Sequence, residues 1–116
     1  MRWIGLRPLP SQGKLQGDGF VKPGYGYILT NKPMGVLYIG VTSDLPGRIE
    51  QHRTRAVAGF TKTFNCDKLV WFERFEDLQD ARLAEVQMKR WKRAWKVRGI
   101  IEQNPQWRDL SGELND

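Results

Sequence analysis

An arginine and a histidine share one face of an expected helix with two aliphatic residues. At the helical spacing i, i+3, i+4 and i+7, the stretch 44–55 carries Leu45, Arg48, Ile49 and His52. The aliphatic pair should pack on a sheet, so Arg48 and His52 should lie beside the buried surface. There an arginine can neutralise negative charge and a histidine can accept a proton. The structural alternative is a snorkelling arginine and a half-buried histidine with satisfied hydrogen bonds.

Two tyrosines lie on neighbouring strands of an expected hairpin. The stretches 25–30 and 36–41 are rich in aromatic and β-branched residues, and a turn composition, Asn-Lys-Pro-Met-Gly, separates them. If residue 30 pairs with residue 35, Tyr27 lies directly opposite Tyr38 on the same face of the sheet. Such a pair could take part in chemistry or could simply stabilise the sheet, and its register depends on the turn.

A carboxylate lies inside the apolar stripe of the next expected helix, over 77–98. At helical spacing this stripe contains Ala81, Ala84, Met88, Trp91 and Trp95. Both tryptophans should therefore belong to the core. Glu85 lies within the stripe, where a carboxylate must be paired or must bind a cation. For a salt bridge, the candidate partners are Arg48, Arg82 and Lys89. The alternative is a metal site, because hard oxygen ligands suit Mg²⁺.

The helix over 77–98 is strongly basic, with seven Lys/Arg against three Asp/Glu. Its cations are interleaved with the two tryptophans, a composition typical of surfaces that bind a phosphate backbone. The candidate nucleic-acid-binding residues are Arg53 of the preceding helix and Lys89, Arg90, Lys92, Arg93 and Lys96.

These residues are positioned by an expected order β-β-α-β-α, followed by a short C-terminal helix. The third strand is expected over 68–75, Thr42-Ser43-Asp44 offers N-caps for the first helix, and Asp77 can cap the second. The second helix should end near Arg98, with Gly99 as a stop or bend. Together the elements indicate an α+β fold, a three-stranded antiparallel sheet flanked by helices. The expected organisation is a flexible leader over 1–24, one domain over 25–110 and a tail over 111–116.

Composition and charge exclude several classes of protein. The chain has 116 residues, the size of one domain, and its single cysteine, Cys66, excludes a disulfide scaffold. No apolar run is long enough to span a bilayer or to act as a signal peptide, so we expect a cytoplasmic protein that does not bind membranes. A Walker loop and Cys/His zinc spacing are also missing from the sequence, and no small-molecule cofactor is expected. The net charge of +6 favours a polyanionic partner, nucleic acid first.

The stretch over 24–53, GYGYILTNKPMGVLYIGVTSDLPGRIEQHR, resembles the signature region of GIY-YIG endonucleases, above all the small single-domain bacterial members. The signature combines two tyrosine motifs, an arginine ten residues after the second tyrosine, a histidine four residues later and a glutamate on the following helix. Tyr25-Gly26-Tyr27 stands in place of the first motif and keeps its last tyrosine. Asn104 is too far from Glu85 to match a further asparagine of the family and is left unassigned.

The resemblance implies a metal-dependent DNA endonuclease that acts in DNA repair or recombination. It assigns the catalytic positions to Tyr27, Tyr38, Arg48, His52 and Glu85. Glu85 would be the ligand of a single Mg²⁺ or Mn²⁺ ion, and Tyr38 would be the general base, positioned by Tyr27. The partner would be DNA, with RNA as the alternative. The competing hypotheses are a catalytically weak nucleic-acid-binding module on the same fold and an RNA- or ribosome-associated basic protein.

Overall fold

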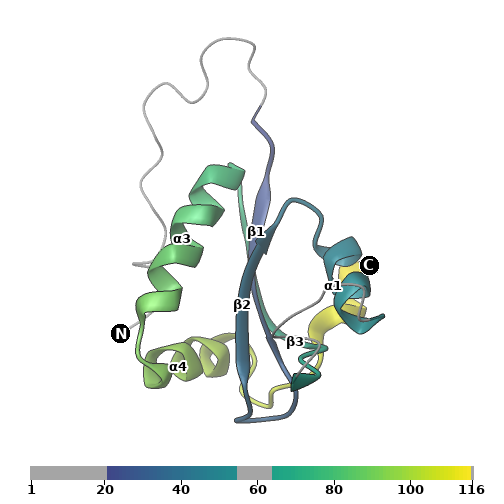
Figure 1. Ribbon diagram of the computed structural model, residues 1–116, viewed down its shortest axis with the longest axis vertical. Coiled ribbons are helices and arrows are strands. Elements are labelled where there is room, and N and C mark those ends of the chain that lie inside the picture. Colours follow the sequence, from purple (N-terminus) through teal and green to yellow (C-terminus); the bar gives the residue numbers. More distant parts are fainter. Residues whose placement is uncertain (1–20, 55–63, 116) are drawn as a thin grey trace.

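The computed structural model describes residues 21–54 and 64–115 (Figure 1). Its elements are β1 (Gly24–Thr30), β2 (Leu37–Thr42), α1 (Leu45–Arg53), β3 (Lys68–Phe75), α3 (Leu78–Arg90), α4 (Arg93–Gln103) and the short 3-10 helix η2 (Leu110–Asn115). The predicted α+β fold with a three-stranded antiparallel sheet is confirmed. The predicted leader falls, up to residue 20, outside the described residues. No helix in the described part of the chain is both long and apolar enough to cross a membrane.

The sheet has the order β2-β1-β3, so β1 is central and β2 forms one edge. The predicted hairpin register is wrong by two residues: Thr30 pairs with Leu37, which leaves Tyr38 opposite Leu29 and diagonal to Tyr27. The turn is longer than expected because Asn31 organises it, its Oδ1 accepting a hydrogen bond of 3.0 Å from the backbone N–H of Val36. Since the shift is an even number of residues, both tyrosines still share one face.

Helices cover both faces of the sheet. Figure 1 shows α3 and α4 on one side and α1 with η2 on the other. Alternate residues of the central strand β1 pack against the two helical layers, because successive side chains point to opposite faces of the sheet. Ile28 packs with Met88 of α3 and Ile100 of α4, whereas Tyr27 packs with Leu45 of α1.

The long helix expected over 77–98 is two helices. α3 ends at Arg90, Trp91 and Lys92 have extended backbones, and α4 then continues past the buried Gly99 to Gln103. A straight helix over 77–103 would be about 40 Å long, roughly twice the length of the seven-residue β1. The break instead returns Ile100 to the core. The expectation that both tryptophans are core residues is wrong for Trp95, which is 38% exposed, while Trp91 is partly buried against the core.

The predicted helix caps are confirmed. The Asp44 side chain accepts a hydrogen bond from the N–H of Gly47, and that of Asp77 accepts one from the N–H of Gln79. These caps satisfy N–H groups that no helical carbonyl can reach. They fix where α1 and α3 begin, and hence which residues of each helix face the sheet.

Candidate active site

A buried hydrogen bond joins β1 to α1. The hydroxyl of Tyr27 lies 3.2 Å from Nε2 of His52, and the two residues are only 1% and 3% exposed. Leu45 and Ile49 are buried between α1 and the sheet, as their spacing predicted, and they orient the helix so that His52 points inward. The histidine is therefore a buried partner of a tyrosine rather than a surface residue.

Tyr38 completes an aromatic group on the same face of the sheet. Its ring centroid lies 5.4 Å from that of His52 and 6.4 Å from that of Tyr27. Tyr38 is half-buried, on the edge strand, whereas Tyr27 on the central strand is enclosed. Of the two tyrosines, only Tyr38 can therefore meet a substrate without rearrangement.

The electrostatics of the group fix its protonation. Burial, together with the Tyr38 hydroxyl, raises the pKa of Tyr27 above its ordinary value, against the lowering effect of Arg48. Burial, and then the positive charge of Arg48, lowers the pKa of His52. At neutral pH both shifts favour the uncharged forms, a protonated phenol hydrogen-bonded to a neutral imidazole. The charge of Arg48 influences the pKa of both partners, in keeping with its place on the same face of α1 as His52.

Glu85 reaches the group from the opposite layer. Glu85 belongs to α3, which covers the opposite face of the sheet from α1. Its helix packs against β2 and β1, with Ala84 and Val41 in one apolar cluster. The carboxylate is 20% exposed, and its charge contributes to the raised pKa of Tyr27. The candidate site therefore lies at the β2 edge of the sheet, where side chains of the two layers approach one another.

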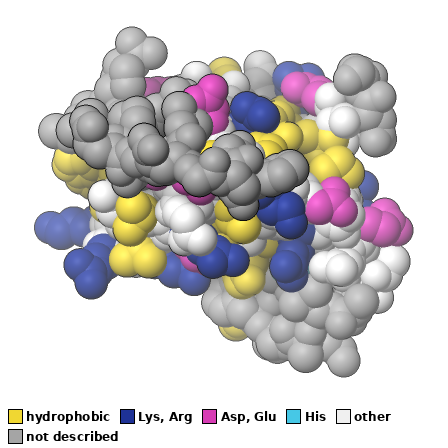
Figure 2. Space-filling model, turned by 90° about the horizontal axis from the view of Figure 1, so that it is seen from above, with side chains coloured by type: hydrophobic (Ala, Val, Ile, Leu, Met, Phe, Trp, Pro, Cys, Tyr) yellow, Lys and Arg dark blue, Asp and Glu magenta, His cyan; other side chains and the backbone are white. Residues whose placement is uncertain are grey.

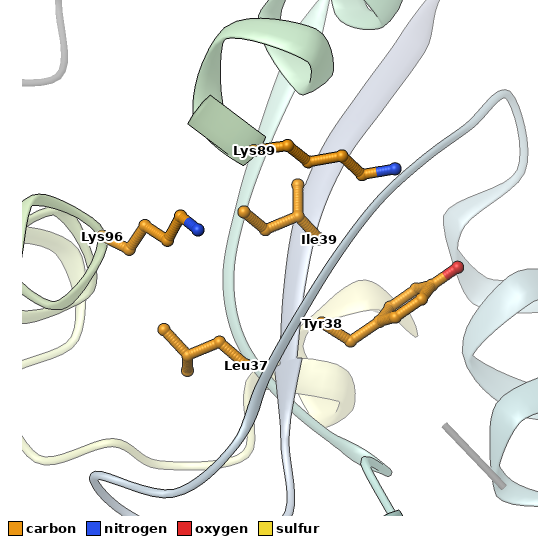
Figure 3. A pocket seen from close by; sticks show the side chains of 5 residues that line it. All are labelled: Leu37, Tyr38, Ile39, Lys89 and Lys96. Carbon is orange, nitrogen blue, oxygen red and sulfur yellow. The ribbon is translucent and has the colours of Figure 1, made fainter. Parts of the chain in front are cut away.

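Lys89 pairs with Glu85, with 3.1 Å between Nζ and Oε2. This was one of the three salt bridges considered for the carboxylate. Lys89 also lines a shallow pocket of about 240 Å³ together with Leu37, Tyr38, Ile39 and Lys96. In Figure 3, Lys89 from α3 and Lys96 from α4 approach β2 from the same side, and Tyr38 points to the other side, toward α1. The pocket thus connects a candidate catalytic residue with two cations.

The candidate nucleic-acid-binding residues differ in what they contact. Arg53 forms an ion pair with Asp109 at 2.5 Å and also bonds the hydroxyl of Ser111, which ties η2 to α1. Arg93 donates from Nη2 to two carbonyls of the hairpin turn. The others lie along α3, α4 and their junction: Lys89, Arg90, Lys92 and Lys96. Figure 2 shows Lys and Arg side chains bordering hydrophobic ones on the side where α3 and α4 lie.

The residues fit a single divalent ion with one protein ligand. Among residues 21–54 and 64–115, no three His, Cys, Asp or Glu side chains cluster as a closed metal cage. Mg²⁺ does not require one, because one or two carboxylates, water and substrate phosphates commonly complete its shell. Glu85, partly exposed beside the pocket, meets that requirement. Asn104 is a buried structural residue that donates a hydrogen bond to Val70 of β3.

The chain is similar to a known domain family and to proteins of several organisms. The family model of the GIY-YIG catalytic domain matches residues 23–98. The UPF0213 protein CPE1444 of Clostridium perfringens is 33% identical over 91 residues, which is 78% of this chain and 97% of that protein. The UPF0213 protein SAG0778 of Streptococcus agalactiae is 35% identical over 75 residues, which is 65% of this chain and 84% of that protein.

One solved structure is also similar. It is the solution NMR structure of the UPF0213 protein BH0048 from Bacillus halodurans, with 26% identity and a TM-score of 0.49 over 76% of this chain and 93% of that one. A GIY-YIG catalytic domain implies nuclease-type chemistry on a nucleic acid. With two thirds of its length matched by the family model, and with a relative matched over nearly its whole length, the chain belongs to the GIY-YIG catalytic domain family.

Proposed function

We propose that this protein is a metal-dependent endonuclease that hydrolyses phosphodiester bonds in DNA. The observation that carries the proposal is the buried Tyr27–His52 hydrogen bond, with Tyr38 packed against the imidazole and Arg48 on the same face of α1 as His52. Binding alone does not need a buried tyrosine–histidine pair next to an arginine. Hydrolysis needs a base for water, positive charge for the phosphate and a metal ligand, and this group with Glu85 supplies all three.

Tyr38 is the candidate general base. Its phenolate would take a proton from the attacking water as the water oxygen bonds to phosphorus and the bond from phosphorus to the 3′-oxygen breaks. The departing 3′-oxygen would take a proton from solvent, which leaves a 5′-phosphate and a 3′-hydroxyl. Arg48 would neutralise the charge that builds up on phosphorus-bound oxygens.

Tyr27 and His52 are positioning residues in this proposal. Tyr27 keeps its proton, since burial raises its pKa, and so it holds the imidazole through the 3.2 Å hydrogen bond. The imidazole ring in turn packs against the ring of Tyr38. Glu85 would hold Mg²⁺ or Mn²⁺, which when bound would polarise the phosphate and stabilise the departing oxygen.

The test is cleavage of labelled duplex, single-stranded, nicked and branched DNA by the whole chain, in Mg²⁺, Mn²⁺ or EDTA. Glu85→Ala should lower the cleavage rate by at least about 10²-fold, as loss of one electrostatic contact at a reacting phosphate does. Glu102→Ala, which removes an exposed carboxylate from α4, is the matched control and should cut normally.

Metal-independent cleavage, or cleavage unchanged in Glu85→Ala, would refute the metal assignment. Salt-sensitive binding by both proteins without cleavage of any substrate would favour the alternative, a nucleic-acid-binding module on this fold. We further propose a cytoplasmic role in DNA repair or recombination, supported by the family's substrate class and the single Cys66. Unchanged survival of a deletion strain after DNA damage would contradict that role.

A further inference from the structure

Two tryptophans form an exposed aromatic corner where α3 meets α4. The ring centroids of Trp91 and Trp95 are 5.6 Å apart, with the rings edge to face, and Trp95 is 38% exposed. Together with Lys92 between them, they line a hollow of about 350 Å³. That volume lies within the range of small-ligand sites, and its walls are two indole rings and the stem of a lysine.

The corner is held in place by backbone contacts. The N–H of Trp91 donates to the carbonyl of Met88 at 3.1 Å, and the N–H of Trp95 donates to the carbonyl of Lys92 at 3.0 Å. At the start of α4, Arg93 donates two hydrogen bonds of 2.7 Å to the turn between β1 and β2. The aromatic surface is therefore fixed relative to the strand that carries Tyr38.

Positive charge connects the corner with the candidate active site. Lys92 lines the aromatic hollow, and Lys96, one turn further along α4, lines the pocket that also contains Lys89 and Tyr38. Burial, and then the charge of Arg93, lowers the pKa of Lys96, as expected where cations crowd together without a polyanion. In Figure 3 the side chain of Lys89 crosses above Ile39 toward β2, and that of Lys96 extends from α4 toward Ile39.

We propose that the α3–α4 corner stacks an unpaired base of the DNA strand that is cut, while Lys92 and Lys96 contact the adjoining phosphates. The inference rests on the proposed function for its ligand. A base within a duplex already stacks on a neighbour at each face, so it gains little stabilisation from an exposed indole. An unpaired base presents a free face, and stacking on an aromatic side chain then stabilises it. The corner would direct the enzyme to strands with unpaired bases beside the cut.

The test is binding of a labelled short oligothymidylate to the whole chain by fluorescence anisotropy, in EDTA so that no strand is cut. An abasic strand of equal length is the second probe, because it has the same phosphates without bases. Trp95→Ala should weaken binding of oligothymidylate by about 5- to 100-fold. The same substitution should leave binding of the abasic strand unchanged, and Trp95→Phe should bind both strands nearly as the unaltered protein does.

Ile101→Ala is the matched control, since Ile101 is 44% exposed on the same helix and lines neither pocket. It should change neither affinity. Equal losses on the two strands, no loss with Trp95→Ala, or no binding of oligothymidylate by the unaltered protein would each overturn the proposal. Failure of the nuclease proposal would be recognised separately. If the protein shows the expected binding pattern but cuts no DNA in Mg²⁺ or Mn²⁺, the stacking proposal stands and the nuclease proposal is refuted.

Discussion

Gly40 lies directly opposite Tyr27 in the β1–β2 ladder, beneath the phenolic end of the tyrosine. A Cβ atom built on residue 40 would lie 2.4 Å from both Cζ and Oη of Tyr27. Carbon atoms do not approach so closely, and the ring is enclosed, so it has little room to move aside. Glycine at this position is what allows the Tyr27 hydroxyl to lie beside His52.

We therefore expect Gly40→Ala to lower the cleavage rate by displacing Tyr27. The added methyl group should displace the Tyr27 hydroxyl, and a misplacement of about 1 Å can cost about 10²-fold in rate. Gly26→Ala is the control: it lies on the same two-stranded ladder, but its Cβ would meet Phe75 and Trp71 at ordinary distances of 3.6 and 3.7 Å. Cleavage assays should show a loss for Gly40→Ala alone, and near-normal cleavage by that variant would show that the hydroxyl's position does not matter.

Stability should depend on pH through His52. Burial and Arg48 lower its pKa in the folded protein, whereas the unfolded chain should titrate near the ordinary value of about 6.5. Between about pH 6.5 and the lowered pKa of the folded protein, the unfolded state binds more protons than the folded state. The free energy of unfolding should therefore decrease as the pH falls through this range, and the contribution of His52 should be complete above about pH 6.5. Urea denaturation at several pH values would measure this.

His52→Gln provides the comparison, because glutamine can still bond with Tyr27 but does not titrate. The variant should lose the part of the pH dependence that lies below about pH 6.5 and keep the part caused by carboxylates. If both proteins lose stability in parallel, the imidazole is not buried in its neutral form.

Local sequence signals predicted the strands and the helix starts. The third strand, KLVWFERF, and the caps Asp44 and Asp77 were all correct, because alternation and capping depend on neighbouring residues. The face shared by Arg48 and His52 was also correct, since it follows from helical geometry alone. The family's spacing then predicted which polar residues form the site.

Three features depended on tertiary structure and were missed. The hairpin register is set by the Asn31 side chain bonding across a longer turn, which composition does not reveal. The break after Arg90 keeps α4 on the sheet, although helix propensity through Trp91–Lys92 would allow continuation. Glu85 lies in the opposite layer from α1 because it belongs to α3, and the apolar stripe of a helix does not reveal which side of the sheet that helix covers.

Substitution of Arg93 should mainly lower the stability of the fold, whereas substitution of Lys92 should mainly weaken DNA binding. Nη2 of Arg93 donates to the carbonyls of Met34 and Gly35, both at 2.7 Å, so Arg93→Ala should detach α4 from the turn. Hydrogen bonds to a charged group contribute about 1.5–3 kcal/mol when buried, and for this exposed group we expect about 1 kcal/mol in urea denaturation. Lys92→Ala should change stability by less than about 0.5 kcal/mol while weakening DNA binding. The opposite pattern would mean that Arg93, rather than Lys92, serves the ligand.

Asn104 and Gln103 offer a matched test of what burial adds to an amide. Gln103 is the last residue of α4, Asn104 is its C-cap, and both side chains bond to β3. Asn104 donates from Nδ2 to the carbonyl of Val70 at 3.2 Å and to that of Arg108 at 2.8 Å. Its Oδ1 accepts a hydrogen bond of 3.0 Å from the N–H of Arg108. Gln103 bonds to the N–H and carbonyl of Phe72, at 3.1 and 2.9 Å, but is exposed.

Asn104→Ala should lower the free energy of unfolding by about 2–3 kcal/mol, because Asn104 is 2% exposed and water cannot replace its bonds to Val70 and Arg108. Gln103→Ala should cost less than about 1 kcal/mol, since solvent can reach the groups it leaves behind. Urea denaturation of the two variants measures the difference directly. Equal losses would show that solvent reaches the Asn104 site, and would remove burial as the reason for its contribution.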